Sequence, residues 1–196
     1  MADIYTIYRL NELALIEQLK QGDEAAFKWL VDNYRNRIHY SVLNILQDTY
    51  EAEDTTQDTF IQVYHSIHDF KGQAALSTWI YRIAIRKALE KCRKKKTRQR
   101  LHSILPWWMP EEKKTVDTAY MNPGISAENK EKASILFKAI DTLPERQKIA
   151  FTLLKVQGMK YEEVCDIMQL GVKAVESLIS RARENLKKEL DHYYNS

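Results

Sequence analysis

The chain has 196 residues, of which 44% are hydrophobic and 29% charged, and its formal net charge is +3. This length fits one ordinary domain or two small ones with hydrophobic cores. The sequence contains no apolar run long enough to span a membrane, and its first twenty residues carry charges where a signal peptide needs an apolar stretch, so we expect a cytoplasmic protein without membrane insertion.

Three helices are predicted in the first third of the chain. Apolar residues at spacings of three and four indicate a short helix over residues 10–20 and a long amphipathic helix over residues 24–46. Gly22 ends the first of these, and Asp23 caps the second. Asp48 and Glu51 resemble a capping box that opens a third helix. The residues expected to face inward from the first and third helices are Leu10, Leu13, Ala14 and Leu19, and Ala52, Thr56, Phe60, Val63 and Ile67.

The outward side of the third helix is acidic. It carries Glu51, Asp54 and Asp58 next to Gln57, and no Lys or Arg occurs from residue 48 to residue 70. DNA would be repelled by such a face. Two interpretations remain open, an ordinary solvated face and a docking surface for a basic partner protein.

A fourth helix is predicted after the loop Lys71-Gly72-Gln73, with Ser77 as its N-cap. Apolar residues cover most of its circumference, in two arcs. The first arc contains Leu76, Trp79, Ile80 and Ile83, and the second contains Tyr81, Ile85, Ala88 and Cys92. The four helices together predict a compact all-α bundle.

A narrow basic stripe remains on the fourth helix. It runs through Arg82, Arg86 and Arg93 into a cluster of further Lys and Arg residues up to Arg100, with only Glu90 against it. The stripe is either a solvated helix end or a binding site for a polyanion such as a phosphate backbone. Trp79 and Tyr81 beside it either belong to the core or stack on unpaired bases.

Residues 97–125 lose the helical periodicity and contain several prolines, which predicts a flexible linker between two helical domains. Trp107 and Trp108 are unusual in a linker. We expect them to pack either on the protein's own domains or on a partner.

The second domain, residues 126–196, is predicted to contain a helix-turn-helix. Ser126 caps its first helix, and Pro144 begins a second helix that ends before Gly158. A helix over residues 161–169 is then followed by a turn at residues 170–172 and by a last helix. Such a last helix fits the DNA major groove, whereas an inert helical hairpin is the alternative. Residues left exposed on it are Lys173, Glu176, Ser177, Ser180, Arg181, Arg183 and Lys187.

Features of an enzyme are missing from the sequence. Cys92 and Cys165 are the only cysteines, and neither has a metal-ligand partner at usable spacing. Paired carboxylates, a glycine-rich phosphate loop and a nucleophile elbow are absent. The histidines in residues 65–69 are adjacent to Ser and Asp, but a catalytic triad needs convergence in space. We therefore expect no enzymatic activity, no metal and no cofactor.

Five motifs, in this order, resemble the extracytoplasmic-function sigma factors, small two-domain initiation factors of bacterial RNA polymerase in the sigma-70 family. The resemblance covers nearly the whole chain. The motifs are GDEAAF at 22–27, AEDTTQDTFIQVY at 52–64, FKGQAALSTWIYRIA at 70–84, LPERQKIAF at 143–151 and the helix-turn-helix segment at 159–186.

The resemblance implies a role for each part. Residues 1–96 would be the region 2 domain, whose acidic helix binds the clamp coiled coil of the largest polymerase subunit. Its loop 70–76 would capture a base flipped out of the promoter −10 element, and the following helix would hold the opened strand. Residues 126–196 would be the region 4 domain, which docks on the polymerase flap and reads the −35 element. The linker would thread the polymerase cleft, and a cognate anti-sigma factor is implied.

The site residues follow from the same resemblance. Those expected at the polymerase are Asp54, Gln57, Asp58 and Phe60. Those expected at the −10 element are Lys71, Gly72, Gln73, Trp79, Arg82, Arg86 and Arg93. Those expected at the −35 element are Lys173, Glu176, Ser177, Ser180, Arg181 and Arg183.

The chain departs from the family pattern at four positions. Many members carry Asn at position 86 and Asp at position 90, where this chain has Arg86 and Glu90. Gln169 stands where the helix-turn-helix turn often has Gly, so the turn would be shifted toward Gly171. Glu176 replaces a common basic residue, and its carboxylate either accepts from cytosine or faces solvent.

One rival function is a stand-alone helix-turn-helix regulator that binds DNA without polymerase. This interpretation assigns no function to the acidic helix. A nucleic-acid enzyme is a second rival, which the missing carboxylate and metal-ligand clusters disfavour.

Overall fold

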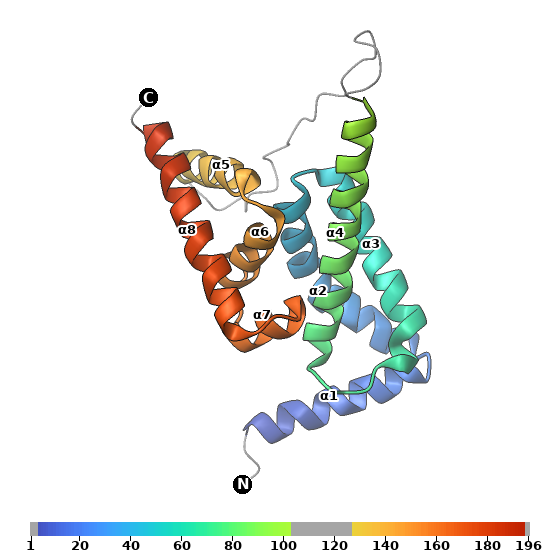
Figure 1. The fold of residues 1–196 in the computed structure, drawn as a ribbon. Coiled ribbons are helices and arrows are strands. Elements are labelled where there is room, and N and C mark those ends of the chain that lie inside the picture. The colour runs from blue at the N-terminus through green and yellow to red at the C-terminus, as the bar shows by residue number, and fades with distance from the viewer. Residues whose placement is uncertain (1–3, 103–126, 195–196) are drawn as a thin grey trace.

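The computed structural model describes residues 4–102 and 127–194, and within these ranges the chain forms helices and short turns without a strand (Figure 1). The all-α prediction is confirmed, with one helical bundle on each side of residues 103–126. Trp107, Trp108 and Ser126 lie outside the described residues. No helix in the described part is both long and apolar enough to cross a membrane.

The first bundle contains α1 (Ile4–Lys20), α2 (Glu24–Leu46), α3 (Thr49–Ser66), the short 3-10 helix η1 (Ile67–Asp69) and α4 (Leu76–His102). Local caps start two of these helices, as predicted. The Asp23 carboxylate accepts from the amides of Ala25 and Ala26 at 2.8 and 3.0 Å, and Asp48 accepts from Glu51 at 3.0 Å.

Helix α1 differs from its prediction in its buried face. Leu13 is 53% exposed and Ala14 is exposed, although both were expected to face inward. The core contacts come instead from Ile16 and Leu19, which are 7% and 4% exposed. Since α1 lies along one edge of the bundle, only a narrow stripe of it is covered (Figure 1).

Helix α4 starts and ends differently from the prediction. It begins at Leu76, with the Trp79 amide donating to the Ala75 carbonyl at 3.1 Å, so Ser77 lies inside the first turn and is not the cap. The helix continues to His102, past residue 96, where the predicted domain ended. Lys, Arg and Gln are good helix formers even without an apolar stripe, which explains the extension.

The second bundle contains α5 (Ala127–Thr142), α6 (Glu145–Phe151), the π-helical segment η3 (Thr152–Val156), α7 (Tyr161–Met168) and α8 (Val172–Tyr194). The single helix predicted from Pro144 to Gly158 is therefore α6 followed by a wider turn. That turn is closed by the Gln157 amide, which donates to the Thr152 carbonyl at 2.9 Å.

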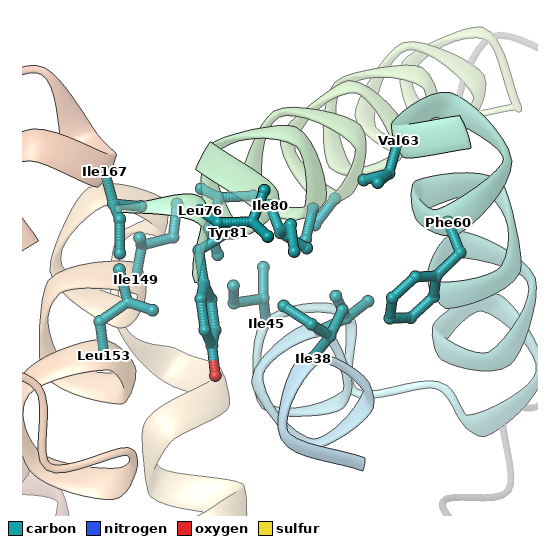
Figure 2. Packing of buried hydrophobic residues seen from close by; sticks show 14 of the residues in the cluster. Ile38, Ile45, Phe60, Val63, Leu76, Ile80, Tyr81, Ile149, Leu153 and Ile167 are labelled. Atoms are coloured by element: carbon teal, nitrogen blue, oxygen red, sulfur yellow. The ribbon is translucent and has the colours of Figure 1, made fainter. Parts of the chain in front are cut away.

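Helix α4 packs on α2 and α3 of its own bundle and on α7 of the second bundle (Figure 1). Figure 2 shows Leu76 and Tyr81 of α4 near Ile149, Leu153 and Ile167 of the second bundle. Buried residues of both bundles form one continuous hydrophobic cluster. This packing explains why two arcs of α4 are apolar.

Candidate functional site

A small cavity of about 150 Å³ opens between the loop after η1 and the first turns of α4. Four residues predicted to act at the −10 element, Lys71, Gln73, Trp79 and Arg82, line it together. Its full lining is Asp69, Phe70, Lys71, Gln73, Ala74, Trp79 and Arg82. Gly72 is in the same loop with φ +67°, a left-handed conformation that favours glycine. The loop and the helix thus form one concave polar site.

The aromatic residues of α4 divide between this cavity and the core. Trp79 is half-buried, lines the cavity and packs its ring on Phe70, with ring centroids 5.1 Å apart and planes at 48°. Tyr81 is 1% exposed, and its burial raises the pKa of its hydroxyl. Trp79 remains able to face a base in the cavity, whereas Tyr81 belongs to the core.

The basic residues of α4 have different surroundings. Arg82 reaches across to α7, where its Nε donates to the Asp166 carbonyl at 2.7 Å and its guanidinium lies 3.9 Å from the Asp166 carboxylate. Arg86 is exposed and pairs with Glu90 at 3.3 Å, and Arg93 is exposed. Only Arg82 of these three is held by the second bundle in this conformation.

The acidic face of α3 carries ion pairs that the sequence analysis missed. Lys91 of α4 donates to Glu51 at 2.7 Å and to Asp54, and Arg35 of α2 pairs with Glu53 at 2.5 Å. These cations lie outside residues 48–70, which is why a search along that helix did not find them. The face is less negative than the sequence of α3 alone indicates.

The pKa values near this face report the same pairing. Burial alone would lower the pKa of Lys91, but the hydrogen bonds that Lys91 donates to Asp54 and Glu51 outweigh it and raise the pKa. The hydrogen bond from Arg35 lowers the pKa of Glu53. Lys91 and Glu53 are therefore charged at neutral pH.

The four residues predicted to bind polymerase are not equally accessible. Asp54 and Gln57 are exposed and Asp58 is partly exposed. Phe60 is only 6% exposed and belongs to the hydrophobic core, so its side chain supports α3 from inside. A direct contact between Phe60 and polymerase stays a prediction.

The helix-turn-helix consists of α7, the turn at 169–171 and α8. Gln169 ends α7 in a left-handed conformation, with φ 53°, and Gly171 accepts backbone hydrogen bonds from Ala174 and Val175 at the start of α8. The turn lies one residue before the predicted residues 170–172, and Gln169 takes the left-handed position without glycine. Cys165 lies partly buried on α7 and packs against the hydrophobic core.

Helix α8 separates an apolar face from a polar one. Val175, Ile179, Ala182 and Leu186 are buried. All six residues predicted to act at the −35 element are exposed on the same helix: Lys173, Glu176, Ser177, Ser180, Arg181 and Arg183. Hydroxyl, guanidinium and carboxylate groups on an exposed helix are able to bond base edges in a major groove.

Metal-binding clusters and the two cysteines can be checked directly in the described residues. No group of three or more His, Cys, Asp or Glu side chains there is arranged to hold a metal ion. Burial raises the pKa of the Cys92 and Cys165 thiols, so neither is an activated thiolate.

Comparison with known proteins decides the family. Residues 30–98 match the family Sigma-70 region 2, and residues 134–186 match Sigma-70, region 4. The ECF RNA polymerase sigma-E factor of Haemophilus influenzae is 33% identical over 187 residues, which covers 93% of this chain and 96% of that protein. The chain is an extracytoplasmic-function sigma factor of the sigma-70 family. It is thus a transcription initiation factor and not an enzyme.

Further relatives of this sigma factor support the same family. The RNA polymerase sigma-H factor of Pseudomonas aeruginosa is 32% identical over 187 residues, with 90% of this chain and 92% of that protein covered. The ECF sigma-E factor of Escherichia coli strain K12 is 30% identical over 177 residues, with the same two coverages.

Two solved structures share the fold of this sigma factor. CnrH, in complex with the cytosolic domain of CnrY, has a TM-score of 0.67 at 21% identity and covers 92% of this chain and 97% of its own. The sigma factor RpoE from Bartonella quintana, in complex with the anti-sigma factor NepR, has a TM-score of 0.64 at 20% identity, covering 84% and 96%.

Proposed function

We propose that this sigma factor binds core RNA polymerase through α3, opens the −10 element at the cavity beside α4 and reads the −35 element with α8. The observation that carries the proposal is the cavity lined by residues 69–71, Gln73, Ala74, Trp79 and Arg82. It combines a half-buried aromatic ring with cationic and amide groups, which suits an unstacked base and the phosphates next to it.

Unstacking a base costs a few kcal/mol, and strand opening requires that binding of the base in the cavity offset this free energy. Trp79 supplies a ring for stacking, and Lys71 and Arg82 supply positive charge at the rim. Arg86 and Arg93, both exposed, extend this charge along α4 in the direction in which an opened strand would leave the cavity.

Recognition of the −35 element is assigned to the exposed face of α8. Arg181 and Lys173 suit guanine, the serines Ser177 and Ser180 suit several bases, and Glu176 suits the amino group of cytosine. Arg183, which is exposed on the same helix, is assigned to a phosphate contact. The flap of polymerase is the surface on which this domain would dock.

Polymerase docking is assigned to Asp54, Gln57 and Asp58, with Phe60 holding the helix in place from the core. A basic partner would compete with Lys91 for the carboxylate of Asp54. The clamp coiled coil of the largest subunit is the partner that the family resemblance implies.

The arrangement proposed for the whole chain has a region 2 domain over 1–96, a linker over 97–125 and a region 4 domain over 126–196, with α4 continuing into the first linker residues. We infer that the protein works in the cytoplasm, where its polymerase is. Since both similar structures named above are complexes with CnrY or an anti-sigma factor, an anti-sigma factor is the regulatory partner we propose.

The polymerase assignment is tested by mixing the purified chain with bacterial core polymerase and measuring a complex by size-exclusion chromatography. A stable complex is expected. No complex would favour a regulator that acts alone. The double variant Asp54→Lys with Asp58→Lys is expected to weaken binding by about tenfold or more, or roughly 1.4 kcal/mol.

A matched control for that variant is Glu184→Lys with Glu189→Lys, which makes the same change of charge at exposed residues of α8. The control is expected to bind core polymerase as the wild type does. If both double variants lose affinity equally, net charge and not the face of α3 determines binding.

A further inference from the structure

A carboxylate from the first helix reaches the start of α4. Oε1 of Glu12 accepts a hydrogen bond from the backbone amide of Leu76 at 2.6 Å, across 64 positions of sequence. Leu76 is the first residue of α4 and is 1% exposed. The first amides of a helix have no partner inside the helix, so this carboxylate satisfies a buried donor and places negative charge at the positive end of α4.

Helix α1 also contacts η1, which ends where the loop of the cavity begins. The loop that joins η1 to α4 therefore meets α1 at both of its ends: through packing at η1 and through the Glu12 hydrogen bond at Leu76. Figure 1 shows this loop passing over α1. The ends of the loop are fixed to one rigid element.

The cavity depends on this arrangement. Two of its lining residues, Lys71 and Gln73, belong to the loop, while Trp79 and Arg82 follow Leu76 by about one and two helical turns. A shift or fraying of the first turn of α4 would move the ring of Trp79 relative to the loop. The shape of the cavity thus follows from where α4 begins.

We propose that Glu12 is a positioning residue for −10 recognition, which fixes the first turn of α4 against α1 and so keeps the cavity shaped to receive a base. Glu12 touches no DNA in this account and acts through Leu76 and Trp79. The inference rests on the proposed function of the cavity and adds to it the reason why α1 belongs to the recognition site.

The first test uses the sigma factor alone. In Glu12→Ala the Leu76 amide is expected to exchange its hydrogen about three- to tenfold faster than in the wild type, because one hydrogen bond is lost. Glu12→Gln keeps an acceptor oxygen and is expected to retain most of the protection. Glu17→Ala, at an exposed carboxylate of the same helix, is the matched control and is expected to change nothing at Leu76.

The second test uses each variant bound to core polymerase. The binding partner is the single-stranded −10 segment of a promoter that the wild-type complex opens, together with copies that are abasic at one position each. The wild type is expected to lose most affinity for the copy that is abasic at the captured position. The ratio of its affinity for the intact segment to its affinity for that copy is the abasic penalty. In Glu12→Ala this penalty shrinks by about three- to tenfold, while affinity for core polymerase and the Glu12→Gln penalty stay at wild-type values.

This penalty is a ratio measured on folded complexes, so a general loss of stability would not change it. An undiminished penalty in Glu12→Ala, or unchanged exchange at Leu76, would overturn the role of Glu12. If Glu12→Ala does not fold, Glu12→Asp, whose carboxylate is one methylene shorter, takes its place with the same two readouts. A wild-type complex without any sensitive position would instead count against the proposed function of the cavity.

Discussion

Long-range contacts of single charged side chains set the geometry of each surface of this sigma factor. Lys91 joins α4 to the acidic face of α3, Arg82 joins α4 to Asp166, and Glu12 joins α1 to α4. Asp23 and Asp48, by contrast, cap helices that begin right after them. Local caps were predictable because the bond is made within three residues, whereas partners that are dozens of residues apart leave no pattern in the sequence.

Arg181→Ala is expected to reduce discrimination at one position of the −35 element by about 1–3 kcal/mol, because Arg181 is exposed on the face of α8 assigned to bases. The measurement is the affinity of the polymerase complex for promoters changed one base pair at a time. Lys188→Ala, exposed nearer the end of α8, serves as the control. A loss of equal size on every promoter would make Arg181 a phosphate contact instead.

His39 predicts a dependence of stability on pH. Its side chain is buried beside Glu53 and Arg35, and burial holds its pKa below the ordinary value of 6.5 in spite of Glu53. The unfolded chain then binds a proton more readily than the folded one. The stabilisation is complete above pH 6.5 and is lost as the pH falls toward the lower folded pKa.

Chemical denaturation at pH 7.5 and 5.5 checks this, with the two values chosen to bracket about 6.5. The free energy of unfolding is expected to fall between them in the wild type and to fall less in His39→Gln. Glu53 does not interfere, since its lowered pKa affects stability only below 4.5. An equal fall in both proteins would show that His39 is not responsible.

At the scale of elements, the turn of the helix-turn-helix forms with an unfavourable residue. Gln169 has φ 53°, in the left-handed region that costs a side-chain-bearing residue free energy. The sequence suggested that this residue shifts the turn toward Gly171, yet Gln169 itself ends α7, and α8 begins at Val172, which was predicted to be the last residue of the turn. Val164 and Val175, on the two helices flanking the turn, are both fully buried.

Gln169→Gly is expected to stabilise the protein by about 0.5–1 kcal/mol, since glycine adopts this conformation without strain but loses more chain entropy on folding. Thermal denaturation measures the difference. Gln47→Gly is the comparison, because Gln47 has φ 54° but is 6% exposed and donates from Nε2 to the Asn44 carbonyl at 2.9 Å. Its gain is expected to be offset by the lost hydrogen bond and packing. Destabilisation by Gln169→Gly would contradict the argument.

Helix positions were largely predictable because apolar spacing repeats along each amphipathic helix, and α2 and α3 match their expected spans closely. Three features could not be predicted in this way: the end of α4, the π-helical segment η3 and the exposure of Leu13. In each case the outcome depends on helix propensity or on neighbouring elements, which the periodicity of one segment does not contain.

At the scale of the whole molecule, the packing of the second bundle on α4 connects the two halves of the proposed function. Arg82 lines the cavity and also donates to the carbonyl of Asp166, so an opened strand would compete with Asp166 for its guanidinium. The two apolar arcs of α4 were visible in the sequence, but which partner covers each arc was not.

Promoter binding is therefore expected to separate the two bundles. Spin labels on Asp32→Cys and Glu184→Cys, both exposed, with Cys92 and Cys165 replaced by alanine, report the distance between α2 and α8. The distance is expected to be short and narrowly distributed in the free protein and longer in the complex with polymerase and promoter. An unchanged distance would mean that Arg82 stays with Asp166 while DNA is bound.

Opening of promoter DNA is the most direct measurement of the central claim. Permanganate, which oxidises unpaired thymines, is applied to a promoter duplex with core polymerase, with and without the purified chain, and the transcripts are mapped in parallel. Reactive thymines in the −10 segment and transcripts from a defined start are predicted only when chain and core polymerase are both present. A duplex that stays closed with both present, and yields no additional transcript, would contradict the account.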